Sequence, residues 1–450
     1  MSRNIGNSKN ESQSESPTSG VPFAVGFSFA FRVITVLVSV RIFGADPQTG
    51  AAANIALDLF FVLATAFCAL GKVRYPLRQM ARLPGVRWAL LFLGFSFCSL
   101  LWSSTVSLPD SMAYWCAMAA DVTIVVMLLR AEPLTDVCDS LMKGFIWGAC
   151  AVAFIAWLMP AESDLRLGDA ELLGPNQIGY VCAFAFFFAQ YLMRNKRAKL
   201  GGPAFVLAVT LLRTLSKTTI VAFLVGEAFL LIRDKSISRR SKILIAFAAM
   251  VVVASFWGLL TSYYAVYTDA GNQSETLSGR LGIWAYFLAE AVQQPWIGHG
   301  FDSAWKVIPP FGPDEFQAAH AHNELLQQFY AYGAVGVCMF IGIYGSIYKH
   351  IRRIASGPLK TFLFAFLIFI LVRGTADTER FDFSLPMWAI VMVSLLIEDA
   401  RATRGKCAQY FACRAIPYGH GYAVDSNYQA GTSGMNGICK RIRRCIFDGR

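Results

Sequence analysis

The sequence predicts an all-α, polytopic integral membrane protein with about twelve transmembrane helices and one large extracytoplasmic loop. Of its 450 residues, 56% are hydrophobic and only 15% are charged, and the mean hydropathy is +0.48. Soluble domains carry about 25% charged residues, so this composition favours the bilayer. Two further observations support the class: apolar stretches recur along the chain, and basic residues gather in alternate loops between them.

The apolar stretches define the predicted spans. A spanning helix needs about 20 mostly apolar residues, or fewer where flanking side chains reach the headgroups. Taken in order, the stretches lie near 23–40, 52–70, 88–102, 112–129, 144–159, 177–193, 203–213, 217–232, 243–262, 323–348, 360–373 and 384–397. The stretch at 203–213 is the shortest and makes the weakest span.

These spans divide the chain into successive regions. Residues 1–22 are rich in Ser, Asn and Gly, carry both charge signs and show no cleavage site, which predicts a disordered cytoplasmic tail. Transmembrane helices 1–9 are expected within 23–262, and a large periplasmic loop at 263–322. Helices 10–12 follow at 323–398, and 399–450 forms a basic cytoplasmic tail.

The orientation follows from the basic residues. Lys and Arg gather in the loops 71–87, 194–202, 233–242 and 349–360, whereas each outside loop carries at most two of them. Because cytoplasmic loops hold the excess of basic residues, both termini are predicted to be cytoplasmic, with the chain in a bacterial inner membrane. The net charge of +11 then reports topology, and no nucleic-acid partner is required.

The large loop contains a helical pattern. The apolar side chains after Arg280 recur at helical spacing: Leu281, Trp284, Ala285, Leu288, Ala291 and Val292. This predicts a helix lying on the membrane surface, with Arg280 at its start. Pro295 ends the helix, and Gly298-His299-Gly300 makes a turn.

A histidine cluster, His320-Ala321-His322-Asn323-Glu324, opens the tenth predicted span. On a continuous helix with about 100° per residue, the following residues share the side of His322: Leu326, Phe329, Gly333 and Gly336. The two glycines are expected to admit a neighbouring helix or a lipid chain.

Several ionisable side chains fall inside predicted spans, among them Arg32, Asp58 and Asp121. Such groups are costly in lipid and are usually paired or functional. A structural ion pair between Arg32 and Asp58, on the first two spans, is expected.

One motif runs from the large loop into the tenth span. His322-Asn323 is followed by nine residues, Gly333, two residues and Gly336. The shorter motifs are Arg280, Trp284, Pro295 and Gly298-His299-Gly300 upstream, Gly174–Gly179 before the sixth span, and Ser216-Lys217-Thr218 before the eighth. Together they resemble the O-antigen ligase / Wzy polymerase superfamily of bacterial envelope glycosyltransferases, over roughly residues 174–350.

Two features resemble the exopolysaccharide-polymerase (ExoQ-like) branch of that superfamily. Lys217 stands where the ligases commonly have arginine, and Gly300–Trp305 is similar to the polymerases. The expected function is therefore polymerisation of lipid-linked oligosaccharide repeats into exopolysaccharide or O-antigen. The alternative inside the family is a ligase that moves finished glycan onto lipid A core or protein. A non-enzymatic transporter of lipid-linked sugars is a third possibility, although the two halves of the chain show no similarity.

The resemblance implies a donor, an acceptor and a mechanism. Members use an undecaprenyl-diphosphate-linked glycan as donor, need neither metal nor nucleotide, and act as inverting glycosyltransferases on the outer face of the inner membrane. No cofactor is expected. The implied partners are the donor, a glycan acceptor, membrane lipids, and a possible chain-length regulator and flippase.

The chemistry assigns roles to individual residues. Negative charge develops on the departing diphosphate, which cationic side chains must hold, so Arg280 is the catalytic cation and Lys217 and Arg213 bind substrate. An imidazole suits removal of the acceptor's proton, and a helix N-terminus favours its neutral form; this is the role of His322. The remaining predicted substrate-binding residues are Trp284, Asn323, Asn176 and His320.

Two points are left open or set aside. A metal site at His320 and His322 is set aside because no acidic residue accompanies them at metal-ligand spacing in the sequence. The outer loop 373–383 carries five charged residues, which either contact glycan or face solvent.

Overall fold

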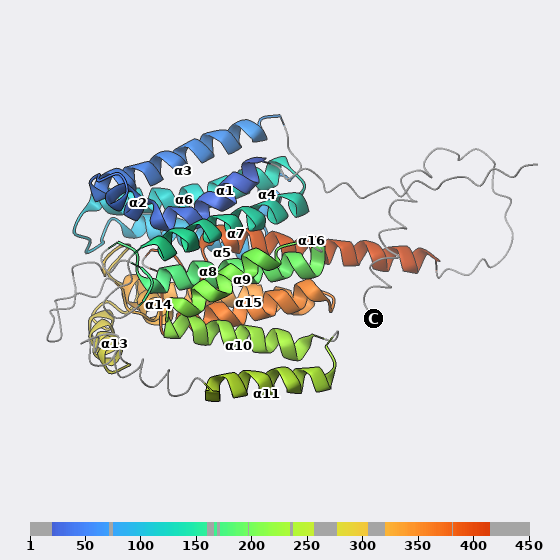
Figure 1. The fold of residues 1–450 in the computed structure, drawn as a ribbon. Helices are drawn as coiled ribbons and strands as arrows, with labels where there is room; N and C mark the ends of the chain where they lie inside the picture. The colour runs from blue at the N-terminus through green and yellow to red at the C-terminus, as the bar shows by residue number, and fades with distance from the viewer. Residues whose placement is uncertain are drawn as a thin grey trace, which may run out of the picture.

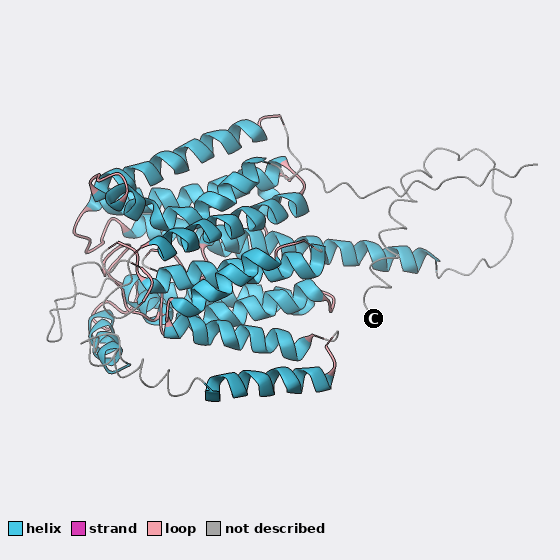
Figure 2. Ribbon diagram, in the orientation of Figure 1, coloured by secondary structure: helices cyan, strands magenta, loops and turns pink. Residues whose placement is uncertain are grey.

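The structure is a computed structural model that describes residues 20–71, 75–159, 166–168, 172–196, 198–234, 237–255, 277–304, 320–379 and 381–414. The predictions for both tails, up to residue 19 and beyond 414, and for 263–276 and 305–319 lie outside the described residues. Within those residues every regular element is a helix, as Figure 2 shows. The all-α prediction is confirmed.

The N-terminal half consists of α1 (Gly20–Phe31), η1 (Arg32–Ile34), α2 (Thr35–Arg41), α3 (Pro47–Ala69), α4 (Leu77–Met80), α5 (Pro84–Ser99), α6 (Leu108–Ala131), α7 (Leu134–Leu158) and α8 (Pro175–Lys196). It is followed by α9 (Gly201–Arg213), α10 (Lys217–Arg233), α11 (Arg239–Ser255), α13 (Leu277–Ala291), α14 (Glu324–Arg353), α15 (Pro358–Gly374) and α16 (Met387–Arg414). Each predicted apolar stretch overlaps at least one of these helices, and the first overlaps α1, η1 and α2.

Local sequence explains where several helices begin. Proline stands in the first turn of α3, α5, α6 and α15, where its missing N–H has no intrahelical partner to lose. Asp46 caps α3 by accepting a hydrogen bond from the backbone N–H of Gln48 at 3.1 Å. Ser107 caps α6 in the same way, through the N–H of Asp110 at 3.4 Å.

Among the residues that the structure describes, five helical stretches are long and apolar enough to cross a membrane: Gly20–Arg41, Gln48–Ala69, Leu108–Ala131, Leu134–Leu158 and Glu324–Arg353. Most of the long helices run side by side, from α3 at one edge to α11 at the other (Figure 1). The chain is therefore a multi-pass membrane protein, and the total of about twelve spans stays a prediction.

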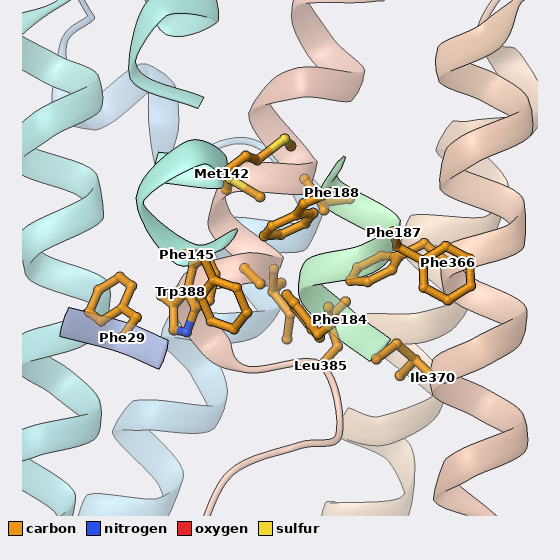
Figure 3. Packing of buried hydrophobic residues seen from close by; sticks show 14 of the residues in the cluster. Phe29, Met142, Phe145, Phe184, Phe187, Phe188, Phe366, Ile370, Leu385 and Trp388 are labelled. Atoms are coloured by element: carbon orange, nitrogen blue, oxygen red, sulfur yellow. The ribbon is translucent and has the colours of Figure 1, made fainter. Parts of the chain in front are cut away.

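The centre of the bundle is aromatic. Figure 3 shows side chains from α1, α7, α8, α15 and the start of α16 meeting there. Phe29 stacks on Trp388 with ring centroids 4.8 Å apart, and Phe184 meets Phe366 edge-on at 4.8 Å. Glycine lets α1 and α7 touch backbone to backbone, because a Cβ on Gly144 would lie 2.0 Å from the carbonyl oxygen of Phe23. Such close packing holds helices together in lipid, where burial of apolar surface provides little driving force.

An ion pair lies at the break after α1. Arg32, in η1, contacts Asp121 of α6 at 2.6 Å between Nη1 and Oδ2. The expected pairing of Arg32 with Asp58 is therefore wrong, because the neighbouring acid on α6 takes the guanidinium. Asp121 is buried, and a buried carboxylate requires such a partner.

Candidate functional site

The site lies at the end of the bundle where α14 begins and α13 runs across the other helices (Figure 1). Asn323 caps α14: its Oδ1 accepts the N–H of Leu326 at 3.0 Å, and its Nδ2 donates to the carbonyl of Thr375 at 3.0 Å. Asn323 thereby ties the start of α14 to the α15–α16 connection. The structure gives this residue a positioning role, and its predicted sugar contact stays a prediction.

His322 precedes the cap in a left-handed conformation, with φ at 50°. Its backbone N–H donates to Nδ1 of His320 at 3.3 Å, and the two rings meet edge-on with centroids 4.1 Å apart. His322 Nδ1 faces Oδ1 of Asp377 at 3.5 Å. Non-glycine residues held at positive φ cluster at functional sites, and here the conformation places an imidazole against a buried carboxylate.

Asp377 belongs to a buried charge cluster. Its Oδ2 contacts Nη2 of Arg373 at 3.0 Å, and the same nitrogen contacts Oε1 of Glu379 at 2.9 Å. The Arg373 guanidinium also lies over the ring of Tyr180, 4.1 Å from its centroid. Arg373 is 1% exposed, and Asp377 is 3% exposed. These are not solvated loop charges, so that interpretation of 373–383 is wrong for Arg373 and Asp377.

The cluster sets the ionisation of its two acids. Burial would raise the pKa of Asp377, but the Arg373 guanidinium and the His322 ring outweigh it and hold that pKa well below its usual value. Burial raises the pKa of Glu379, although Arg373 offsets part of the shift. Asp377 is therefore a carboxylate at any physiological pH.

Asp377 is a residue of the candidate site that the sequence analysis did not single out. The available signal was its spacing of four residues from Arg373 at the end of an apolar run, which places both on one face of a last helical turn. Charges in a short outer loop resemble ordinary solvated residues, and only the fold brings them to His322.

A neighbouring acid holds the next helix. Asp382 accepts the backbone N–H groups of Phe383 at 2.7 Å and Met387 at 3.0 Å, and so caps α16. Burial raises the pKa of Asp382 to about 7. The segment is further fixed by Glu324, whose Oε1 accepts the N–H of Ser384 at 3.0 Å.

The motif glycines interrupt α14. Gly333 has φ 61° and ψ −151°, which breaks the helix and frees the carbonyls before it. The turn after Pro295 enters this break: the N–H of His299 donates to Tyr330 at 3.1 Å, and the N–H of Ala334 donates to Pro295 at 2.7 Å. A Cβ on Gly333 would lie 2.4 Å from the carbonyl carbon of Trp296, so a side chain there would expel the turn.

Two expectations about α14 are corrected by this break. His322 precedes the helix, and the helical phase is lost at Gly333, so the common side predicted for His322 and the two glycines does not exist. Gly333 admits the backbone of the Pro295–Gly300 turn, rather than a helix or lipid chain. His299, within that turn, is buried and stacks on Tyr330 at 4.6 Å, which is a structural role.

The same turn is anchored on its other side to the N-terminal half. The N–H of Phe301 donates to Ser99 Oγ at 3.0 Å, and Asp302 Oδ2 accepts from Ser111 Oγ at 2.8 Å. The turn is therefore fixed between α14 and the α5–α6 connection.

Helix α13 packs on the start of α14 through a second apolar cluster, whose buried members are Ile283, Phe287, Ala291, Ala304, Ala321 and Tyr330. Trp284 is partly buried at the edge of this cluster. Leu281, Leu288 and Val292 of the predicted apolar stripe are each at least half exposed, and the position of this helix on a membrane surface stays a prediction. Both faces of the helix are apolar, so periodicity alone could not tell which one meets protein.

Arg280 and the Ser216-Lys217-Thr218 motif come together. Arg280, in the first turn of α13, donates from Nη1 to Oγ1 of Thr218 at 3.1 Å. Thr218 lies in the first turn of α10, directly after Lys217, and Arg213 ends the preceding helix α9. The sequence analysis assigned Arg280, Lys217 and Arg213 to one diphosphate. The structure places Arg280 against Thr218, next to Lys217, at the start of α10.

Asn176 holds the start of α10 in place through hydrogen bonds. Its Oδ1 accepts hydrogen bonds from Ser216 Oγ at 2.7 Å and from Nη2 of Arg166 at 3.3 Å. Arg166 is buried, and its Nε donates to the carbonyl of Thr214 at 3.3 Å. Asn176 and Arg166 thus hold the turn between α9 and α10. The sequence analysis did not single out Arg166, because it is the only basic residue in its loop and belongs to no motif.

A further correction concerns metal ligands. One ligand atom from each of His320, His322 and Asp377 lies within 4.8 Å of the others. The argument that the histidine pair has no acidic partner is wrong, because the fold brings Asp377 to it.

The fold and this site define a class: a multi-pass membrane protein with an imidazole–carboxylate pair and a group of cations at one end. Comparison with known proteins then shows what the chain is similar to. Residues 202–341 match the O-antigen ligase family, Wzy_C. The chain is 26% identical over 337 residues to an O-antigen ligase of Pseudomonas aeruginosa, covering 72% of this chain and 79% of the relative. It is 22% identical over 321 residues to the exopolysaccharide production protein ExoQ of Rhizobium meliloti, covering 65% and 72% respectively.

These matches confirm the resemblance drawn from the motifs. The family model and the Pseudomonas aeruginosa relative are both named as O-antigen ligases, and the second relative is named for exopolysaccharide production. The matched segment contains Arg213, Lys217, Arg280 and His322, whereas Asp377 lies beyond its end.

Proposed function

We propose that the chain polymerises undecaprenyl-diphosphate-linked oligosaccharide repeats into exopolysaccharide or O-antigen at the outer face of the inner membrane. The observation that carries this proposal is His322, backed by the ionised Asp377, at the end of the bundle where Arg280 meets the Lys217 motif. That arrangement suits a displacement in which one group takes a proton and others hold a departing anion.

His322 acts as the base. Its Nδ1 faces the Asp377 carboxylate, so the neutral ring carries its proton on Nδ1 and leaves Nε2 as the acceptor. The attacking sugar hydroxyl gives its proton to Nε2 as its oxygen bonds to the anomeric carbon. Asp377 then stabilises the imidazolium, as a buried carboxylate does behind a catalytic histidine.

The cationic side chains stabilise the departing diphosphate. As the new bond forms, the bond from the anomeric carbon to the diphosphate oxygen breaks, and its electron pair stays on the diphosphate. Arg280 offers two parallel N–H groups and Lys217 a compact charge, with Arg213 close by at the end of α9. Attack from the face opposite the leaving group inverts the anomeric centre. Trp284 and His320 are proposed to contact the sugars. No step in this mechanism requires a metal.

A ligase is the second candidate, because the matched family and the Pseudomonas aeruginosa relative carry that name. Lys217 and the ExoQ relative favour the polymerase. The two functions share the donor and differ in the acceptor. A flippase that delivers the donor and a chain-length regulator are proposed partners of the polymerase.

A deletion strain complemented with variants tests the proposal. Without the gene, a missing polymerase leaves single lipid-linked repeats, whereas a missing ligase leaves long unattached chains. His322→Ala should fail to restore product while inserting at the wild-type level, and His350→Ala, at the opposite end of α14, should restore it. Restoration by His322→Ala would exclude the assigned base.

A further inference from the structure

Three side chains that the proposed reaction uses or neighbours also form a ligand set for a metal ion. His320 and His322 come from the segment before α14, and Asp377 comes from the segment after α15. One ligand atom from each lies within 4.8 Å of the other two. Two imidazoles and one carboxylate, with a fourth position open, are a common zinc ligand set.

The distances between these side chains also suit a metal ion. Ligand atoms on a tetrahedral zinc, with bonds of about 2.0–2.1 Å, are separated by roughly 3.3 Å. His322 Nδ1 and Asp377 Oδ1 are 3.5 Å apart, which is close to that separation. His322 Nδ1 is shielded from solvent, and no atom of the described residues forms a hydrogen bond with it by geometric criteria. His320 is partly buried, and one of its ring nitrogens lies within 4.8 Å of the ligand atoms of His322 and Asp377.

The surroundings favour a dication. Asp377 is fixed by Arg373 on Oδ2 and by the N–H of Thr378 at 3.0 Å on Oδ1, the kind of support that orients metal ligands. Arg373 is bound by two carboxylates, Asp377 and Glu379, so the cluster carries no excess of positive charge when both acids are ionised. Imidazole ligands select zinc over magnesium or calcium, which prefer oxygen.

We propose that His320, His322 and Asp377 bind a zinc ion that inhibits the enzyme. The inhibitory part rests on the proposed function, and the binding part does not. A metal on Nε2 of His322 blocks the base directly. A metal on Nδ1 confines the ring proton to Nε2, so that nitrogen cannot accept a proton from the acceptor.

Binding is tested on the purified full chain in detergent, with Co2+ as a spectroscopic probe and Zn2+ by calorimetry. The wild type should bind one metal with the visible absorption of a nitrogen–oxygen site and without the near-ultraviolet band of cysteine thiolates. His320→Gln and Asp377→Asn should weaken binding at least tenfold, and His350→Gln should bind as the wild type does. Unchanged affinity in His320→Gln, or absence of this signal in the wild type, would overturn the site.

Inhibition is tested with purified enzyme and a lipid-linked repeat as substrate. Zinc should abolish transfer by the wild type, and a chelator should restore it. A chain that binds the metal but never transfers sugar would refute the proposed function and leave the site standing. An active enzyme that zinc does not inhibit, or that a chelator inactivates, would refute the inhibitory role.

Discussion

The substitution Asp377→Asn tests whether the negative charge that faces His322 is needed, while the shape of the site is kept. The amide keeps the size of the side chain and can still accept the N–H of Thr378, but it removes the negative charge that faces the imidazole. A base that loses its orienting carboxylate is expected to act more slowly without losing substrate affinity. The effect should therefore appear in kcat, with KM nearly unchanged.

The structure sets the expected size of the loss. General base catalysis contributes about 10²–10⁴-fold. Asp377 shares its charge with Arg373 at 3.0 Å and lies 3.5 Å from the ring. The lower end therefore applies, a loss of about 100-fold in kcat, or about 2.7 kcal/mol in the activation barrier. Arg373 keeps Glu379 at 2.9 Å, so the cost to stability should be smaller than the roughly 3–5 kcal/mol of stripping a buried pair completely.

The assay is transfer from a purified lipid-linked repeat by enzyme in detergent, with the amount of folded protein measured by size-exclusion chromatography. Asp110→Asn is the matched control, because Asp110 is an exposed acid in the first turn of α6. A well-folded Asp377→Asn enzyme with more than half of the wild-type kcat would show that His322 works without this carboxylate.

Three other changes have definite expected outcomes. Arg280→Ala should abolish polymer in cells at a normal protein level, because it removes the cation at Thr218, and normal polymer would remove Arg280 from its role. Gly333→Ala should lower the free energy of unfolding by about 1–3 kcal/mol, because its Cβ would strike Trp296. Gly345→Ala is the control, because a Cβ there meets nothing within 4 Å. Equal melting temperatures of the two variants would contradict the inserted turn. Asp382 has a pKa raised to about 7 in the folded chain, so folding binds a proton and wild-type stability should fall as pH rises from about 4 to 7. Asp382→Asn should remove this pH dependence of stability. The variant should melt at a higher temperature than the wild type at pH 8, and the two melting temperatures should agree near pH 4. A difference in melting temperature that stays the same from pH 4 to pH 8 would contradict this prediction.

Sequence patterns predicted much of the fold because apolar length and basic loops are direct consequences of the bilayer. Each apolar stretch overlaps at least one helix of the structure. The sequence analysis assigned Arg280 and Lys217 to one diphosphate, and in the structure Arg280 contacts Thr218, next to Lys217.

The remaining features depend on long-range packing. Asp377 reaches His322 only after α14 and α15 have packed, so its charge looks like an ordinary loop residue in the sequence. Leu281 and Leu288 follow a helical period, yet they are exposed because lipid as well as protein can cover an apolar face. A glycine such as Gly333 reveals its conformation only when another backbone occupies the space beside it.

The interruption of α14 also fixes the depth of the chemistry. From Gly333 to Arg353 the helix rises about 31 Å at about 1.5 Å per residue, which equals the thickness of the hydrocarbon layer. Under the proposed function, we expect the portion before Gly333 to lie among the headgroups, with His322 at the end farthest from the bilayer centre. A sugar chain of any length could reach that level from water while its carrier stays embedded, so we expect selection mainly of the few sugars nearest the lipid.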